Sequence, residues 1–445
     1  MRLAILGGGG FRVPLVYGAL LRDHSPGRVT EVVLHDPDAG RLAAVALVLE
    51  QLGTRHTDPP RVVTTDDLDT ALHGADFVFS AIRVGGLAGR TRDERVALDL
   101  GVLGQETTGP GGLAYALRTV PVAVDIAERT RRLAPDAWFI NFTNPAGIVT
   151  EAMQSVLGDR VIGICDSPIA LARRAIGALG LDPAATEIDY VGLNHLGWLR
   201  ALRVDGVDHL PRLLADPAAL QRLEEGRLFG PEWLSTLGAL PNEYLYYYYF
   251  TREAVASILE APQTRGEFLL GQQSAFYDAV ARHPEEAAAE WSRVREQRDA
   301  TYMREARAEG EERDEADVAG GGYEGVALAI MAAISRGEAS TMILNIRNGS
   351  AVPGLPEDAV VEIPCTVDRQ GPRAATLPPA QGHQLGTMQQ VKAVERAVIE
   401  AATTGSADAA LRAFALHPLV DSVSTARRLL AGYRAASPEV DALLS

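Results

Sequence analysis

Arg2-Leu3-Ala4-Ile5-Leu6-Gly7-Gly8-Gly9-Gly10 opens the chain with a short apolar run followed by four glycines. Such a run is typical of a strand buried on both faces of a sheet. A helical spacing of apolar residues follows over residues 13–21. Glycines between a buried strand and a helix let the backbone approach a pyrophosphate held at the helix N-terminus. The opening therefore predicts a dinucleotide-binding turn.

The end of the second predicted strand supports this interpretation. That strand covers residues 31–35 and is followed by Asp36. An acidic side chain here can bond the ribose hydroxyls of adenosine and repel the extra phosphate of NADP, so NAD is favoured. We expect cofactor contacts from the glycine turn, from Phe11 and Arg12, and from Asp36. Arg12 stands where the usual Gly-x-Gly-x-x-Gly motif has its third glycine. The alternative is therefore a glycine turn in some other kind of α/β protein.

Strand and helix patterns alternate through the first third of the chain. Further strands are expected over residues 61–64, 77–82, 137–141 and 161–165, with helices over 40–52 and 113–133. Alternation of this kind is typical of a parallel, doubly wound sheet with helices on both faces. The sequence predicts a Rossmann-like NAD-binding domain over residues 1–165, similar to that of lactate and malate dehydrogenases.

The pattern changes after residue 165. Strands are expected over residues 188–194, 198–204, 342–345 and 360–364, and helices over most of 211–313 and over 389–403. A dense run of charges at 309–317 is typical of a solvated helix face, ended by Gly320-Gly321-Gly322. We expect residues 166–445 to form an α+β domain that binds metal and substrate and folds over the strand ends of the first domain.

Composition excludes several other classes. The 445 residues carry 42 basic and 58 acidic side chains, a net charge of −16, so nucleic acid and anionic membranes are poor partners. No apolar stretch is long enough for a membrane span. Two cysteines exclude a disulfide framework, and we expect a cytoplasmic protein. The single lysine, Lys392, excludes a P-loop and leaves no other residue for a Schiff base.

Three polar side chains follow predicted strands at the edge where ligands of such sheets bind. Cys165 ends the strand at 161–165, His195 follows the strand at 188–194, and Asn144 follows the strand at 137–141. A cysteine and a histidine can hold a soft or borderline divalent metal with positions left for substrate. Taken singly, each has a structural alternative: a buried thiol, a packed histidine, or a helix start at Pro145.

The motifs together resemble those of glycoside hydrolase family 4, in the family's order and over most of the chain. They are Arg90-Thr91-Arg92-Asp93-Glu94, Gly104-Gln105-Glu106-Thr107-Thr108-Gly109-Pro110-Gly111-Gly112, Asn144-Pro145-Ala146, Cys165-Asp166-Ser167-Pro168, Gly192-Leu193-Asn194-His195, Tyr244-Leu245-Tyr246-Tyr247-Tyr248 and Glu362-Ile363-Pro364-Cys365. The chain is therefore identified as a member of that family, in its 6-phosphoglucosidase group.

The resemblance implies roles for individual residues. Cys165 and His195 match Mn²⁺ ligands, and Tyr244 matches the base that removes the proton from sugar C2. Asp166 matches an acid beside the metal. Three further residues match substrate-binding positions: Arg90, Asn144 and Arg265. A homo-oligomer, dimer or tetramer, is the expected assembly.

Family 4 uses NAD instead of the paired carboxylates of most glycosidases. The resemblance implies oxidation at C3, loss of the C2 proton, elimination of the aglycone, addition of water and final reduction. The metal would act as a Lewis acid on the C3 ketone. An NAD-dependent sugar dehydrogenase is the main alternative, and a non-catalytic NAD sensor is another.

The expected substrate is a 6-phospho-β-glucoside. The motif at residues 165–168 resembles that of phosphosugar enzymes, with Asp166 commoner in α-specific members. The stretch at residues 141–147 resembles β-specific members, so a 6-phospho-α-glucoside is the alternative. The family's first turn usually carries hydroxyls, which Gly10-Phe11-Arg12 lacks. Arg12 is a candidate for the missing contact, and with Arg90 and Arg265 a candidate phosphate ligand.

Overall fold

The first third of the chain forms the predicted parallel sheet. The structure is a computed structural model that describes residues 1–301 and 322–445, so the charged run at 309–317 and two of its following glycines lie outside it. Six parallel strands run in the order β3-β2-β1-β4-β5-β6. They are β1 (Arg2–Leu6), β2 (Glu31–His35), β3 (Arg61–Thr65), β4 (Phe77–Ser80), β5 (Trp138–Asn141) and β6 (Val161–Gly163). This order and direction define a doubly wound α/β sheet.

Both faces of this sheet are buried, because neighbouring side chains of a strand point to opposite sides. Leu3 and Ile5 join one apolar core, whereas Ala4 and Leu6 join another. The first core is covered by α1 (Val13–Leu21), α2 (Ala39–Gly53), α7 (Ser167–Leu179) and α17 (Tyr323–Arg336). The second is covered by α3 (Leu68–Leu72), α5 (Pro110–Leu133) and α6 (Ala146–Leu157).

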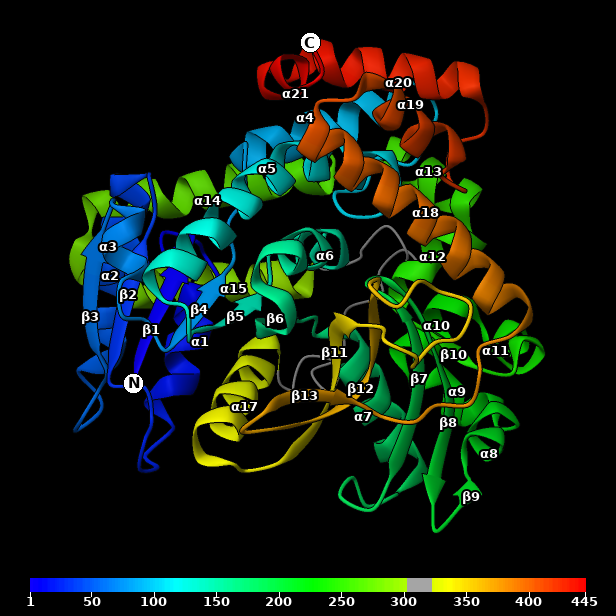
Figure 1. The fold of residues 1–445 in the computed structure, drawn as a ribbon, viewed down its shortest axis with the longest axis horizontal. Helices are drawn as coiled ribbons and strands as arrows, with labels where there is room; N and C mark the ends of the chain where they lie inside the picture. Colours follow the sequence, from blue (N-terminus) through cyan, green and yellow to red (C-terminus); the bar gives the residue numbers. More distant parts are fainter. Residues whose placement is uncertain (302–321) are drawn as a thin grey trace.

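The later strands extend the same sheet instead of forming a separate one. β11 pairs antiparallel with β6, and the order continues β11-β12-β7-β8-β10. These strands are β11 (Ser340–Arg347), β12 (Val360–Asp368), β7 (Glu187–Leu193), β8 (Leu196–Val204) and β10 (Leu240–Pro241), with β9 (Val207–Asp208) and β13 (Gly371–Ala374) paired at its sides. Figure 1 shows the parallel strands at the left and β7 and β8 at the right.

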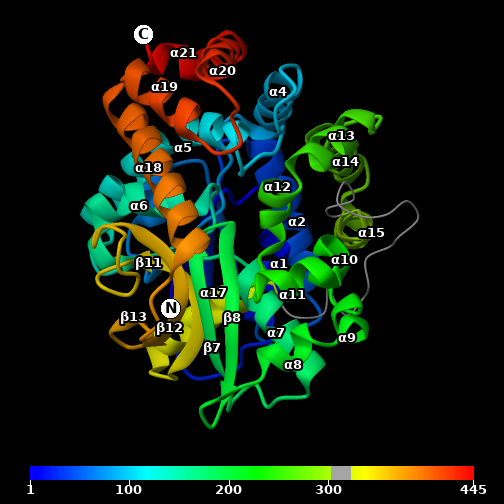
Figure 2. The ribbon, with the colours of Figure 1, turned by 90° about the vertical axis from the view of Figure 1, so that its right-hand side faces the viewer.

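Helices from the second part return to the first. α14 (Arg265–Arg282) and α15 (Ala287–Ala300) contact α2, and α14 also contacts α4 (Gly86–Leu98). α18 (Gly382–Thr404) and the helices after it lie against α4 and α5, at the top of Figure 1 and Figure 2. Those last helices are α19 (Ala407–Leu416), α20 (Val423–Ala436) and α21 (Pro438–Leu443). The two parts are thus joined by packing as well as by the sheet.

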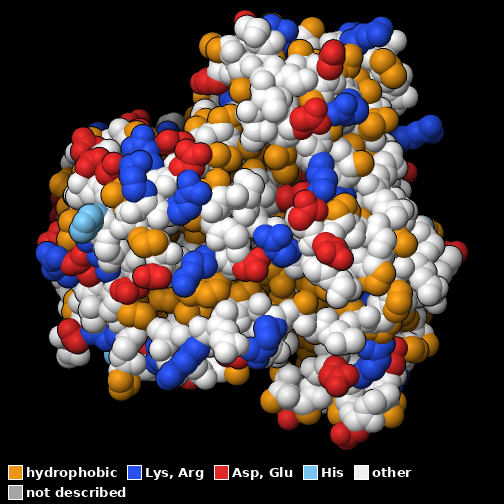
Figure 3. Space-filling view, viewed as in Figure 1, with side chains coloured by type: hydrophobic (Ala, Val, Ile, Leu, Met, Phe, Trp, Pro, Cys, Tyr) orange, Lys and Arg blue, Asp and Glu red, His pale blue; other side chains and the backbone are white. Residues whose placement is uncertain are grey.

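Six shorter helices lie between β9 and α14 along the chain. They are α8 (Leu210–Leu214), α9 (Pro217–Gln221), α10 (Glu224–Phe229), α11 (Pro231–Leu237), α12 (Tyr246–Tyr249) and α13 (Thr251–Glu260). No helix among the described residues is both long enough and apolar enough to cross a membrane. On the face drawn in Figure 3, acidic and basic side chains are interspersed, so the net negative charge is not gathered there in one patch.

Candidate active site

One large cavity lies at the carboxyl ends of the parallel strands, with a volume of about 870 Å³. Its walls come from both parts of the chain, and it collects nearly every residue that the sequence singled out. Lining it are Gly7, Gly9, Gly10, Phe11, Arg12, Asp36, Arg90, Asn144, Cys165, Asp166, His195, Tyr244 and Arg265. Gly8 is the exception: it packs on β2, where an added Cβ would come within 2.8 Å of the Leu34 Cβ.

The glycine turn is tightly bound to the strands beside it. Gly7 has φ +80°, and an added Cβ would be 2.7 Å from the Ala81 carbonyl oxygen, so this position requires glycine. The Gly9 N–H donates to Asp36 Oδ2 at 3.0 Å. Asp36 does not cap the following helix, because that role belongs to Asp38. Asp36 thus orders the turn and presents its carboxylate at the cavity wall.

Three aromatic side chains from the second part hold this turn by its carbonyl groups. Tyr277 Oη donates to Gly9 O at 2.6 Å, and Trp291 Nε1 donates to Phe11 O at 2.8 Å. Tyr323 Oη donates to Arg12 O at 2.8 Å. The carbonyls are therefore satisfied from outside the turn, and the helix N-terminus of α1 remains directed at the cavity as a site suited to an anion.

Arg12 lies on an aromatic stack. The rings of Phe142 and Tyr323 are nearly parallel, with centroids 4.0 Å apart. The Arg12 guanidinium carbon is 5.6 Å from the first centroid and 5.3 Å from the second, which are cation–π distances. Its side chain is therefore held at the cavity wall, where the sequence departs from the family's hydroxyl-bearing turn.

Cys165 and His195 line the same cavity although they follow strands that are not neighbours. Cys165 follows β6, and His195 lies in the two-residue turn between β7 and β8, while β11 and β12 run between those strands. His195 has φ +63°, a left-handed conformation that costs a non-glycine residue on the order of 1–2 kcal/mol. A strained histidine at a cavity wall is an arrangement found at functional sites.

Electrostatics suit these two side chains to a metal. Burial lowers the pKa of His195 to about 4, so its imidazole is neutral at neutral pH and can donate a lone pair. Burial, with the negative charges of Glu362 and Asp166, raises the pKa of Cys165 above its usual range. The thiol therefore needs a nearby cation to ionise, and a coordinated divalent metal supplies one. The donor set fits a divalent metal of borderline softness.

The protein offers few ligands at this point. Within residues 1–301 and 322–445, no group of three or more His, Cys, Asp and Glu side chains could hold a metal ion. Cys165 and His195 are thus the candidate pair, with Asp166 Oδ1 at 4.0 Å from the Cys165 sulfur. A metal held by so few side chains keeps coordination positions open for a substrate.

Tyr244 lies directly against His195. It belongs to a short 3₁₀ turn, Glu243–Leu245, whose start is fixed by the Asn242 side chain accepting the Tyr244 N–H at 3.0 Å. The rings of Tyr244 and His195 stack with centroids 3.8 Å apart and an interplanar angle of 24°. The predicted base and the predicted metal ligand are therefore in contact.

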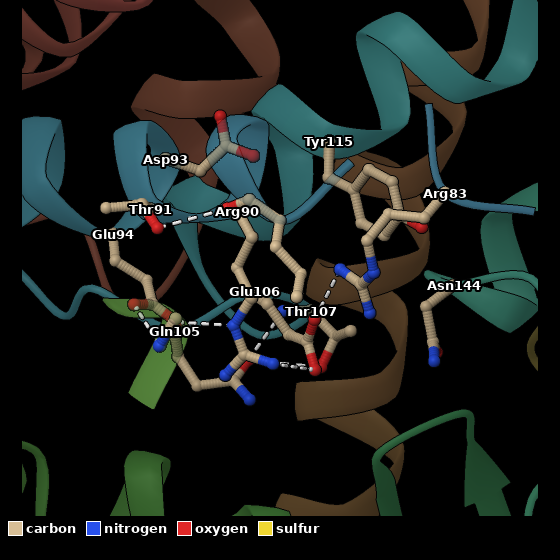
Figure 4. A network of polar contacts seen from close by, with 12 residues as sticks. Arg83, Arg90, Thr91, Asp93, Glu94, Gln105, Glu106, Thr107, Tyr115 and Asn144 are labelled. Carbon is tan, nitrogen blue, oxygen red and sulfur yellow. Dashed lines mark hydrogen bonds and ion pairs between the residues drawn. The ribbon is translucent and has the colours of Figure 1, made fainter. Parts of the chain in front are cut away.

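Arg90 does line the cavity, but carboxylates already bind it. Its Nε contacts Glu94 Oε1 at 2.7 Å and its Nη1 contacts Glu106 Oε1 at 2.8 Å. Arg83 bonds the other Glu106 oxygen at 2.6 Å, and Figure 4 shows Glu106 between the two arginines, with Asn144 beyond Arg83. Burial would raise the pKa of Glu106, but the two guanidinium groups outweigh it and lower that pKa to about 2.

Glu106 explains a motif to which the sequence assigned no role. Added Cβ atoms at Gly111 and Gly112 would each lie 2.3 Å from a carbonyl oxygen, of Gln105 and Thr107 respectively. The glycines thus let residues 104–112 fold tightly on themselves and hold Glu106 at the cavity wall. The motif at residues 104–112 was the sequence feature that could have identified Glu106. The motif does not indicate that Glu106 pairs with Arg83 and Arg90.

Arg298 is a second residue that the sequence did not identify. It lines the cavity from α15, where its guanidinium carbon lies 5.9 Å from the centroid of the Phe11 ring, and its side chain forms no hydrogen bond or ion pair with another described residue. Burial lowers its pKa below the usual range, as do the neighbouring charges of Arg12 and Arg265. Arg265 donates to the carbonyl oxygens of Arg298 and Thr301 at 3.1 and 3.2 Å, so it caps α15. Three arginines, Arg12, Arg265 and Arg298, therefore line the same cavity.

The fold and the cavity define a class: a doubly wound α/β protein with its ligand site at the carboxyl ends of the strands. Within that class, residues 2–181 match the family described as Family 4 glycosyl hydrolase, and residues 190–420 match its C-terminal domain. These matches cover most of the chain. The chain belongs to the family 4 glycosyl hydrolases.

Individual relatives agree with this assignment. A probable 6-phospho-beta-glucosidase of Bacillus subtilis is 31% identical over 97% of this chain and 95% of its own. The structure of the 6-phospho-beta glucosidase from Thermotoga maritima, with NAD and glucose-6-phosphate, superposes with a TM-score of 0.83, 27% identity and 99% coverage of each chain. A 6-phospho-alpha-glucosidase from gut microorganisms, in complex with NAD and Mn²⁺, has a TM-score of 0.78 at 26% identity and covers 97% of each.

Proposed function

We propose that this chain is an NAD- and divalent-metal-dependent glycosidase that hydrolyses 6-phosphoglucosides, with the β anomer preferred. The observation that carries the proposal is the stack of Tyr244 on His195, in the same cavity as Cys165 and the glycine turn. The relatives with NAD, Mn²⁺ and glucose-6-phosphate in their structures support the same combination.

NAD, when bound, supplies reversible oxidation at sugar C3, and a divalent metal held by Cys165 and His195 supplies Lewis-acid polarisation of the oxygen there. The chain itself contributes proton transfer. The Tyr244 phenolate removes the proton from C2, which is acidic because the oxygen on the neighbouring C3 is polarised. Asp166, beside Cys165, donates a proton to the departing aglycone oxygen. General acid and base groups of this kind each contribute about 10²–10⁴-fold.

The arginines of the cavity support a phosphorylated substrate. Arg298 lines the cavity, and Arg12 and Arg265 lie near enough to lower its pKa. Guanidinium groups match phosphate oxygens bidentately, so three of them at one cavity wall suit a phosphate group. Arg90 is a weaker phosphate candidate, since Glu94 and Glu106 already bind it. Its role is to hold Glu106, and with it one wall of the cavity.

The anomeric preference rests on a short stretch of sequence. Residues 141–147 resemble β-specific members, and the B. subtilis relative carries a β-glucosidase name. The 6-phospho-α-glucosidase is the alternative, with a relative of nearly equal identity, 29%, in Leptotrichia buccalis. Elimination from C1 through proton loss at C2 does not demand one anomer as direct displacement does.

A substrate panel tests the proposal. Purified protein is assayed with NAD⁺ and Mn²⁺ on 4-nitrophenyl α- and β-glucosides, each with and without a 6-phosphate, while absorbance reports NADH. We expect cleavage of the β-6-phosphate to be fastest, without NADH accumulation, and lost on chelation. Equal or faster cleavage of the unphosphorylated β-glucoside would remove the phosphate claim. NADH formed in proportion to product would instead indicate a dehydrogenase.

A further inference from the structure

Glu362 is a buried carboxylate without a cation. It lies on β12 and is fully inaccessible to solvent, and no arginine or lysine among the described residues forms an ion pair with it. Three neutral donors bind it instead: Tyr190 Oη at 3.0 Å on Oε2, and the amides of Asn194 and Asn345 at 3.2 and 2.9 Å on Oε1. Burial of such a charge is costly unless something nearby compensates it.

The sheet register puts Glu362 between the two strands that lead to the candidate metal ligands. Along one row, Gly163 of β6 pairs with Asn345, Asn345 with Glu362, and Glu362 with Gly192 of β7. Cys165 follows Gly163 by two residues, and His195 follows Gly192 by three. The strand pair β11–β12 therefore inserts Glu362 between the strands that end at those ligands.

Gly163 and Gly192, at the two ends of this row, leave room for the side chains of Asn345 and Glu362. An added Cβ at Gly163 would lie 2.8 Å from the Asn345 Cβ, and one at Gly192 would lie 2.4 Å from the Gly197 Cα. Glu362 thus lies, with no ion-pair partner among the described residues, on the row that joins the strands leading to Cys165 and His195.

We propose that Glu362 is a positioning residue of the metal centre: it supplies the buried negative charge behind Cys165 and His195, and it holds the His195 turn through Asn194. The inference rests on the proposed metal site. The hydrogen bond from the Asn194 amide to Glu362 fixes the residue before His195, and so helps to hold His195 in its left-handed conformation. Partners that orient ligands are commonly worth about 10–100-fold in metal affinity.

Glu362→Gln isolates the charge. The glutamine oxygen can accept from both asparagine amides, and its NH₂ group can donate to Tyr190 Oη, so the number of hydrogen bonds is kept. We expect the Kd for Mn²⁺, measured from free Mn²⁺ by electron paramagnetic resonance, to rise about 10–100-fold. The Kd for NAD⁺ stays within twofold. At saturating Co²⁺, the thiolate-to-metal absorption of Cys165 is retained.

Two further variants complete the test. Tyr190→Phe deletes one hydrogen bond but keeps the charge and the Asn194 contact, and its Mn²⁺ affinity should stay within threefold of wild type. Asn194→Ala severs only the link to the turn and should weaken Mn²⁺ binding about tenfold, which keeps the inference testable if Glu362→Gln does not fold. Wild-type affinity in both Glu362→Gln and Asn194→Ala would overturn this inference alone. Mn²⁺ binding that survives Cys165→Ser combined with His195→Ala would overturn the metal centre and the inference with it.

Discussion

The glycine turn and the Cys165–His195–Tyr244 corner face the same cavity but are built in different ways. The turn is one continuous stretch, residues 7–12, in which each glycine meets a close neighbour. The corner is assembled from three segments, with β11 and β12 inserted between two of the strands involved. A site made from one stretch can be located from sequence, whereas a site made from several depends on how distant strands pair.

The two regions should also fail differently. Substitutions at the corner should abolish turnover and leave NAD⁺ binding intact, because the turn is held by other residues, Asp36, Tyr277, Trp291 and Tyr323. Substitutions in the residues that hold the turn should weaken NAD⁺ binding and leave metal binding intact. The predictions below test this separation, from the largest effect to the smallest.

Tyr244→Phe should reduce kcat about 10²–10⁴-fold, the usual contribution of a general base, with NAD⁺ affinity unchanged. Only the hydroxyl is lost, so the stack on His195 is kept. Exchange of solvent deuterium into C2 should disappear with turnover. Tyr249→Phe is the control, because Tyr249 bonds Trp198 away from the cavity and should retain activity. Unchanged C2 exchange in Tyr244→Phe would assign the base to another residue.

Cys165→Ser and His195→Ala should each raise the Kd for Mn²⁺ by more than about 100-fold. A residue that only orients a ligand is worth about 10–100-fold, and a ligand itself should be worth more. At limiting Mn²⁺ both variants should lose turnover, and chelation should abolish turnover in the wild type. NAD⁺ affinity, measured by quenching of tryptophan fluorescence, should not change. Cys365→Ser is the matched control, since that thiol is fully buried on β12 and donates to the Ile363 carbonyl. Near-normal activity of either variant at limiting Mn²⁺ would remove that ligand from the centre.

Arg298→Gln should reduce kcat/KM for the 6-phosphorylated substrate about 10–100-fold, because a hydrogen bond to a charged group is worth about 1.5–3 kcal/mol. The unphosphorylated glucoside should be affected little. Arg293→Gln, on the exposed side of the same helix and paired with Glu290, is the control. An equal loss on both substrates would show that Arg298 does not bind the phosphate, and a selective loss of NAD⁺ affinity would assign it to the cofactor.

Tyr277→Phe should raise the Kd for NAD⁺ about 2–10-fold, the value of one hydrogen bond of about 0.5–1.5 kcal/mol. It removes the donor to Gly9 O and leaves the aromatic packing in place. Tyr17→Phe loses one comparable bond, to Pro60 O, on the far side of α1, and should not alter NAD⁺ binding. A change in Mn²⁺ affinity on Tyr277→Phe would contradict the separation of the two regions.

Local patterns were enough for the parallel half of the molecule. The strand at Arg2–Leu6, the helix at Val13–Leu21 and the strand at Glu31–His35 were predicted with the bounds that the structure has. Each depends on side-chain periodicity and on turn residues nearby in the chain. For the same reason the glycine turn and Asp36 could be placed together, since consecutive parallel strands end at one edge.

The antiparallel half could not be assembled in this way. Residues 342–345 and 360–364 were predicted as strands, but pairing partners more than a hundred residues away carry no local signal. Arg90 was expected to meet substrate, and only packing showed that Glu94 and Glu106 bind it. Arg298 and Glu106 were missed as site residues because their role depends on neighbours supplied by other helices and loops.

The sequence by itself determined the doubly wound half, the cofactor turn and the identity of the chemistry-bearing residues, because these depend on short-range periodicity and on motifs. Tertiary structure alone decided that β11 and β12 enter the same sheet, that Glu362 thereby lies between the strands leading to Cys165 and His195, and that Arg298 packs on Phe11 at the cavity wall. Burial, charge pairing and strand register are properties of residues far apart in the chain, so they exist only once it has folded.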